Sequence, residues 1–284
     1  MNDVIQVLAN LSTLVFVVSS MISLGLSLTV QQILAPLKDR GLVLRVLLAN
    51  FVLVPLVAYG LKTVMPLDDS LGIGLILLAT AAGAPFLPKL AQASKGNVPL
   101  SVGMMVLLMV VTVIYVPVVL PLLLPGVQVN PVDIGRSLVI LMLIPLGLGL
   151  LVKDRYEAIA QGLQPSMAWA SSASLLAVFV LMLGLNGESV LGAIGSGALW
   201  AAVILIAASL AIGYALGGLS SSVKSVVGLG TAQRNIAAAL VVASGNFADD
   251  PSVLTMILVG GLLMLVMLMP LAGEIGKRSP NPTP

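Results

Sequence analysis

The side chains with the most evident chemistry in this sequence stand together at Thr231, Gln233, Arg234 and Asn235, within GLGTAQRNIAAAL. A guanidinium is permanently charged and presents its N–H donors in a planar fork, and the neighbouring amides and hydroxyl add donors and acceptors. Such a fork holds a carboxylate through two parallel hydrogen bonds. These residue types therefore predict a binding site for a small organic anion.

Two more polar residues interrupt apolar runs elsewhere in the chain. They are Lys89 in GAPFLPKLAQ and Asn50 in LLANFVLVP. A lone amide in an apolar segment is also typical of a hydrogen bond between helices, so that alternative stays open for Asn50. We assign both residues to the predicted substrate site.

The composition indicates what must hold these residues in place. Hydrophobic residues make up 59% of the 284 positions and charged residues 8%, far outside the range of soluble domains. The apolar runs are about 20 residues or longer, which is typical of helices rather than barrel strands. We expect an all-α polytopic membrane protein with nine spans, at about 7–30, 43–64, 70–91, 98–124, 134–152, 165–186, 191–217, 224–246 and 251–272.

Arg234 falls about ten residues from the nearer end of its span, which is close to the bilayer midplane at 1.5 Å per residue. The 11 acidic residues all fall in loops, tails or helix ends. No carboxylate is therefore expected at that depth. Since a charge inside the membrane costs several kcal/mol, we interpret Arg234 as functional. The alternatives are a snorkelling side chain and a structural salt bridge.

Helix-breaking residues fall in two of the nine spans. Pro85 and Pro88 interrupt the third span from the start, and Gly228 and Gly230 precede Arg234 in the second span from the end. Interrupted spans at corresponding positions of two halves are typical of the binding site of a secondary transporter. Simple kinks and small-residue helix packing are the alternatives.

Several classes of function are excluded by what the sequence lacks. It has no cysteine and no histidine, and no nucleophile with a neighbouring base is evident. We therefore expect that the protein is not an enzyme and that it binds no metal and no cofactor. The formal charge of +2 does not indicate a nucleic-acid partner. The expected partners are a small anionic organic substrate and the lipid bilayer.

Basic residues in the loops predict the orientation. One side of the membrane collects nine of them, and the other only Lys62 and Arg136. By the positive-inside rule, we expect the N-terminus outside the cell and the C-terminus in the cytoplasm. The membrane is expected to be the plasma membrane, which in a bacterium is the inner membrane.

The segments LGLSLTVQQIL, ANFVLVPLVAYGL, ASKGNVPLSV and TAQRNIAAALVVASGNF resemble, in order and spacing, the bile acid:sodium symporter family. The resemblance implies one transmembrane transporter domain over 1–284 with inverted repeats and two broken helices that cross near the midplane. It also implies a panel of about 7–30 and 134–186, and a core of about 43–124 and 191–272.

The chain departs from that family where sodium binds. The resemblance places Leu87 and Pro88 where sodium-coupled members have a Ser-Asn pair, and Met105 and Met109 where they have hydroxyls. The expected glutamate falls on Gly228 or Leu229, while Asn50 and Gln233 keep oxygen donors. These departures predict that Arg234 and Lys89 replace bound sodium in an organic-anion transporter that works by alternating access. A sodium-coupled symporter with another ion site and a non-transporting sensor are the alternatives.

Overall fold

A computed structural model describes residues 2–124, 130, 132, 135–136, 139–192, 195–247 and 250–278. Two of the acidic residues, Asp133 and Asp249, and short parts of the expected spans 134–152 and 191–217 lie outside this set. The described residues form helices and no strands, which confirms the all-α fold class within that part of the chain.

The chain divides into two compact units, each described here by itself. Unit 1 comprises Met1–Ala35 and Gly135–Glu188. Unit 2 comprises Pro36–Ile134 and Ser189–Pro284. The polar residues singled out in the sequence all belong to unit 2.

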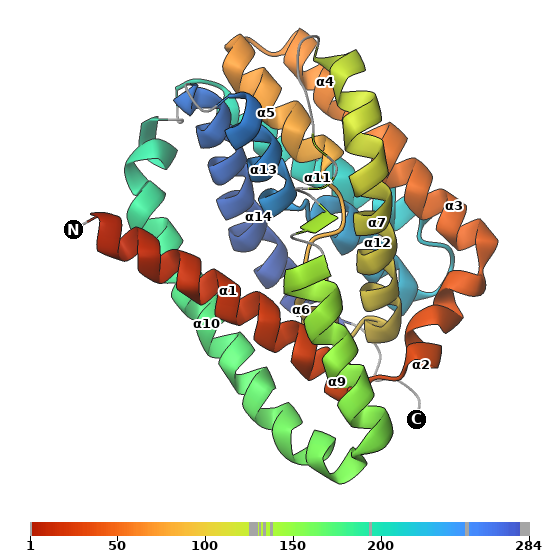
Figure 1. Ribbon diagram of the computed structural model, residues 1–284. Helices are drawn as coiled ribbons and strands as arrows, with labels where there is room; N and C mark the ends of the chain where they lie inside the picture. The colour runs from red at the N-terminus through yellow and green to blue at the C-terminus, as the bar shows by residue number, and fades with distance from the viewer. Residues whose placement is uncertain are drawn as a thin grey trace. The chain divides into compact units, whose positions relative to one another are not determined.

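Unit 1 contains α1 (Asn2–Ser27), α2 (Val30–Leu34), a π-helical turn η3 (Val139–Leu143), α9 (Ile144–Arg155) and most of α10 (Glu157–Gly192). α1 packs closely on α9 (Figure 1). The contact depends on Gly25 and Gly149, because a Cβ atom on Gly149 would lie 2.6 Å from the carbonyl oxygen of Ile22. Glycines thus bring the two backbones together.

Unit 2 holds the remaining helices, and Figure 1 shows α5 beside α14 within it. They are η1 (Ala35–Lys38, which begins at the unit boundary), α3 (Arg40–Leu48), η2 (Ala49–Leu53), α4 (Val54–Val64), α5 (Asp69–Thr80), α6 (Leu87–Ala93), α7 (Val98–Leu123), α11 (Ala198–Leu216), α12 (Ser221–Ala232), α13 (Ile236–Asn246) and α14 (Pro251–Arg278).

Among the described residues, five helical segments are long and apolar enough to cross a membrane, or six if the bent pair Leu11–Ser27 and Val30–Lys38 counts as one. The chain is therefore an integral membrane protein. Nine spans stay a prediction. α5 is a separate short apolar helix because six residues without helix divide it from α6.

Both spans expected to be interrupted contain a break, although three of the four residues predicted to cause it do not lie in it. In the first span the break covers residues 81–86 and includes Pro85. Pro88 instead occupies the first turn of α6, where its missing N–H would have no helical partner anyway. Gly228 and Gly230 lie inside the continuous helix α12, and the second break comes later, at residues 233–235.

The two glycines of α12 serve packing rather than helix breaking. A Cβ on Gly230 would lie 2.8 Å from side-chain carbons of Leu87 and Met104, and one on Gly228 would press on Tyr214 of α11. α12 therefore approaches α6, α7 and α11 through glycine positions. The expectation that these glycines form the break was wrong for that reason.

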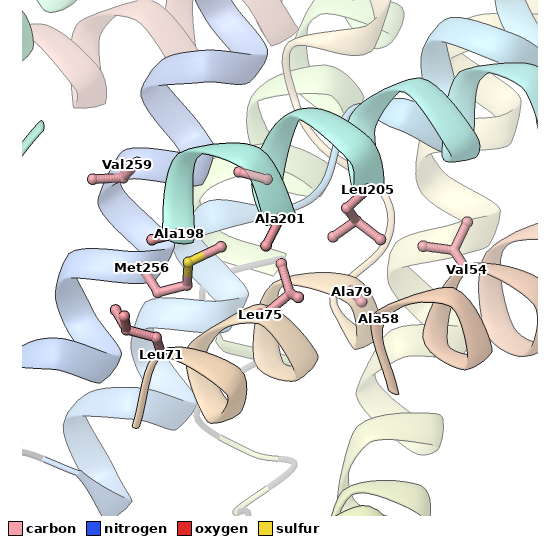
Figure 2. Packing of buried hydrophobic residues seen from close by; sticks show 11 residues of the cluster. Val54, Ala58, Leu71, Leu75, Ala79, Ala198, Ala201, Leu205, Met256 and Val259 are labelled. Atoms are coloured by element: carbon pink, nitrogen blue, oxygen red, sulfur yellow. The ribbon is translucent and has the colours of Figure 1, made fainter. Parts of the chain in front are cut away.

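A core of buried side chains holds α5, the helix before the first break, within unit 2. Figure 2 shows Leu71, Leu75 and Ala79 of α5 packed among residues of α4, α11 and α14. The other labelled members are Val54, Ala58, Ala198, Ala201, Leu205, Met256 and Val259. Ala79 lies in the last turn of α5, so this core holds the C-terminal end of α5 in place.

Candidate functional site

Arg234 occupies the second break with only 1% of its surface exposed. Its guanidinium meets the C-terminal turn of α5, where Nη2 donates to the Ala79 carbonyl at 2.5 Å and Nε to the Leu78 carbonyl at 3.4 Å. Carbonyls in the last turn of a helix lack helical partners and carry its negative partial charge. The end of α5 is therefore a natural receptor for a cation.

The second half-helix contributes in the same way. Arg234 Nη1 donates to the carbonyl oxygen of Thr231, in the last turn of α12, at 3.2 Å. The backbone N–H of Arg234 lies 3.4 Å from the sulfur of Met264. The guanidinium thus joins the C-terminal ends of both broken helices, α5 and α12.

Asn50 provides the remaining oxygens. Arg234 Nη1 donates to Asn50 Oδ1 at 2.7 Å, and Nη2 to the Asn50 carbonyl at 3.4 Å. All five N–H groups of an arginine fork are thereby used. Every acceptor is electrically neutral, and no acid pairs with Arg234 among the described residues, so the positive charge is solvated but not cancelled.

The carbonyl of Asn50 is free to accept because of the π-helical turn η2 and the proline that follows. Val54 N–H bonds to Ala49 O, so in the same register Asn50 O would need an N–H on Pro55, which has none. Pro55 also deprives Phe51 O of its α-helical donor, and the hydroxyl of Tyr115 donates there at 2.7 Å.

The side chain of Asn50 also bonds to α3 and to α12. Its Nδ2 donates to Val46 O at 2.9 Å and to Thr231 Oγ1 at 3.2 Å. Thr231 can lie this close to α11 because position 213 is glycine: a Cβ there would be 2.7 Å from Thr231 Oγ1. Three of the predicted site residues, Asn50, Thr231 and Arg234, thus form one hydrogen-bonded cluster.

Asn235 connects the two breaks to each other. Its backbone N–H donates to Ala81 O at 2.9 Å, and its Nδ2 donates to Gly83 O at 3.1 Å. Its Oδ1 accepts from Ala238 N and so caps the first turn of α13. Asn235 thus fastens one interrupted span to the other and caps α13.

Thr112 of α7 holds the first break from the other side and was missed in the sequence. Its Oγ1 accepts from Ala82 N at 3.2 Å and donates to Ala82 O at 3.1 Å. Gly83, the next residue, has φ +81° and lies against Met109. The signal available in the sequence was a hydroxyl residue within the long apolar run that forms α7.

The other predicted site residues take different places. Gln233 is 2% exposed and ends α12, with its backbone N–H on Leu229 O. Lys89 lies on α6 and is partly exposed. The five hydrogen bonds that the guanidinium donates go to Asn50, Leu78, Ala79 and Thr231.

The residues where the two breaks meet do not fit a sodium ion. Sodium requires several oxygen ligands, and the oxygens gathered here already accept from Arg234. Leu87, Met105 and Met109 are buried and supply carbon and sulfur where oxygen ligands would be needed.

Comparison with known proteins adds a family match to this geometry. A family model described as the Sodium Bile acid symporter family matches residues 14–193. Sodium/bile acid cotransporter 4 of Homo sapiens is 24% identical over 226 residues, covering 76% of this chain and 52% of that protein. The protein of the same name from Mus musculus is 23% identical with the same coverage. The chain spans about half the length of the curated relatives it matches.

Proposed function

The chain belongs to the sodium bile acid symporter family, and on that premise we propose that it is a secondary transporter of small organic anions that works by alternating access. Membership points to transport rather than catalysis. The observation that carries the proposal is the position of Arg234 at the ends of two broken helices, which in secondary transporters line the substrate and ion sites.

Arg234 takes the place of the coupling cation in this proposal. In transporters with broken helices, the carbonyls at half-helix C-termini coordinate sodium or a proton. Here the carbonyls of Leu78, Ala79 and Thr231 bind a guanidinium instead. A covalently attached cation cannot leave, so it satisfies these oxygens permanently and removes the need for a sodium gradient. Lys89 is proposed as a second, less buried positive charge beside the substrate.

The site acts on an anion through charge rather than through the open fork expected from the sequence. With every N–H of Arg234 directed at protein oxygens, the guanidinium has no pair of donors left for a carboxylate in this structure. Its charge is uncancelled and lies in a low-dielectric interior, where electrostatic attraction is stronger than in water. An anion entering next to the crossing is stabilised by that charge.

A sodium-coupled symporter is the second candidate, favoured by the names of both relatives, which describe sodium/bile acid cotransporters. Two observations argue against it. Buried apolar residues occupy the positions where the family resemblance places sodium ligands, and Asn50 Oδ1 already accepts a hydrogen bond from Arg234. A non-transporting sensor is a third candidate, without an observation of its own in its favour.

The two units are proposed to be the panel and the core. Their boundaries at residues 35–36, 134–135 and 188–189 support this, because they fall in or beside the loops that divide the expected panel from the expected core. The inverted repeat, the nine spans, an outside N-terminus and a cytoplasmic C-terminus are proposed with it.

Counterflow of a panel of organic anions in proteoliposomes tests the function. We expect exchange in potassium buffers at the rate seen in sodium buffers, and a strict sodium requirement would refute the proposal. Arg234→Ala should lose exchange and unfold at a lower temperature, whereas Arg45→Ala, the same change at the end of α3, should do neither.

Chemical rescue separates the cation from the side chain. Millimolar methylguanidinium should raise the unfolding temperature of Arg234→Ala more than that of the unaltered protein, because the oxygens left by the deletion bind the free cation. An equal response of the two proteins would contradict the role given to Arg234.

A further inference from the structure

The polar groups at the crossing are satisfied by one another with a single exception. Arg234 uses all of its N–H groups. Both side-chain atoms of Asn50 and of Asn235 are bonded, and Thr231 Oγ1 accepts from Asn50. Among these described side chains, Gln233 Oε1 is buried without a hydrogen-bond partner.

An unmet acceptor in this position is costly. Gln233 is 2% exposed, so water does not solvate its oxygen freely, and a buried carbonyl without a donor loses the full free energy of its hydration. The backbone that carries this side chain is held in place, because the Gln233 N–H is bonded to Leu229 O and the next residue, Arg234, donates five side-chain hydrogen bonds. The oxygen is thus presented by a fixed piece of backbone.

The positive charge of Arg234, the next residue in the chain, decides which kind of hydrogen-bond donor suits this oxygen. A second free cation beside Arg234 would be repelled by the guanidinium. The oxygen of an anionic group would be repelled by the amide oxygen itself. A neutral hydroxyl or amide N–H avoids both conflicts, and a molecule that also carries a negative charge gains the attraction of Arg234.

We propose that Gln233 Oε1 accepts a hydrogen bond from a hydroxyl or N–H group of the transported anion. This rests on the proposed transport of organic anions and narrows the substrate class to acids that bear such a donor near the carboxylate. Gln233 is then the specificity-determining residue, and Arg234 supplies attraction common to all anions. An acid without the donor leaves the amide oxygen unpaired when it binds, which is the strongest form of discrimination available to a polar site.

The test uses three acids of one carbon skeleton: 2-hydroxyisovalerate, 2-oxoisovalerate and isovalerate. Each competes for counterflow in proteoliposomes that contain the unaltered protein. We expect the hydroxy acid to compete at least about tenfold better than the other two, since each tenfold step corresponds to one modest hydrogen bond. Equal competition by the three acids would overturn the assignment of Gln233 and leave anion transport standing. Exchange of no anion at all would refute the proposed function itself.

Gln233→Met keeps the length of the side chain and removes the acceptor. In this variant the apparent affinity for the hydroxy acid should fall to that for isovalerate. Gln92→Met, the same change at an exposed position of α6, should keep the preference of the unaltered protein. A preference that survives Gln233→Met would overturn the proposal.

One further measurement concerns cations and needs no transport. If sodium, compared with potassium, raises the unfolding temperature of the unaltered protein but not that of Gln233→Met, the oxygen binds a cation and the proposal is wrong. We expect the two salts to have the same effect on both proteins.

Discussion

Arg234 Nη1 and Asn50 Oδ1 lie 2.7 Å apart, although 184 positions separate the two residues in the chain. The bond joins the break between α12 and α13 to the π-helical turn between α3 and α4. Its acceptor is a neutral amide, which binds the guanidinium without cancelling its charge. A substitution of Asn50 can therefore keep an acceptor for Arg234 and change the net charge of the pair.

Asn50→Asp retains the acceptor and adds a negative charge. We expect the protein to fold but to unfold at a lower temperature, because the Nδ2 bonds to Val46 O and Thr231 Oγ1 are lost. A buried ion pair replaces the amide bond to Arg234, and anion exchange should fall at least about tenfold because the carboxylate cancels the charge of Arg234. Counterflow and thermal unfolding in detergent measure the two effects. Undiminished exchange by a folded Asn50→Asp protein would show that the charge of Arg234 does not attract the substrate.

Thr112→Val should destabilise the protein by about 1–3 kcal/mol, because the N–H and C=O of Ala82 both lose their partner in a buried break. Thr80→Val is the matched control. Its hydroxyl donates only to Ile76 O and Leu77 O in its own helix, and these carbonyls keep backbone donors. Equal unfolding temperatures for the two variants would argue against the role given to Thr112.

Gly83→Ala tests the conformation of the first break. A φ of +81° costs an alanine about 1–2 kcal/mol, and the new Cβ would lie 2.6 Å from the backbone nitrogen of Met109. We expect lower stability and weaker exchange, since Gly83 O also accepts from Asn235. Gly60→Ala, in α4, has nothing within 4 Å of the new Cβ and should be neutral or slightly stabilising.

Gly149→Ala should weaken unit 1, because the added methyl group meets the backbone of α1 at Ile22 and Gly25. Gly147→Ala changes the same helix two residues earlier, where no atom lies within 4 Å of the Cβ. The unfolding temperature of Gly149→Ala should fall below that of Gly147→Ala. The opposite order would mean that α1 and α9 do not depend on this close approach.

Hydropathy was enough to predict the helical class, and helix-breaking residues marked the two spans that contain a break. These features depend on the side chains of many neighbouring residues, which a sequence displays directly. The position of the second break was not predicted correctly, since Gly228 and Gly230 suggested a break where the helix instead needs close packing. A glycine favours both situations, and only its neighbours in space distinguish them.

Three residues of the hydrogen-bonded cluster were singled out in the sequence, but their bonding was not predicted. Arg234, Asn50 and Thr231 were recognised because polar side chains are rare in apolar spans. Four of the five acceptors of Arg234 were not recognised, because they are backbone carbonyls, which every residue possesses. Their availability depends on where the helices end and on the register of η2, and neither follows from the types of the residues concerned.

The turn at Ala49–Leu53 makes the length of this segment as important as its composition. Deleting one residue within it would return the chain to α-helical register and turn the preceding part of the helix by about 100° relative to α4. Asn50 would then face away from Arg234 or be lost, while every other polar residue of the cluster kept its place in the sequence. A homologue shorter by one residue here would therefore need another way to hold its arginine, even if all of its substitutions were conservative.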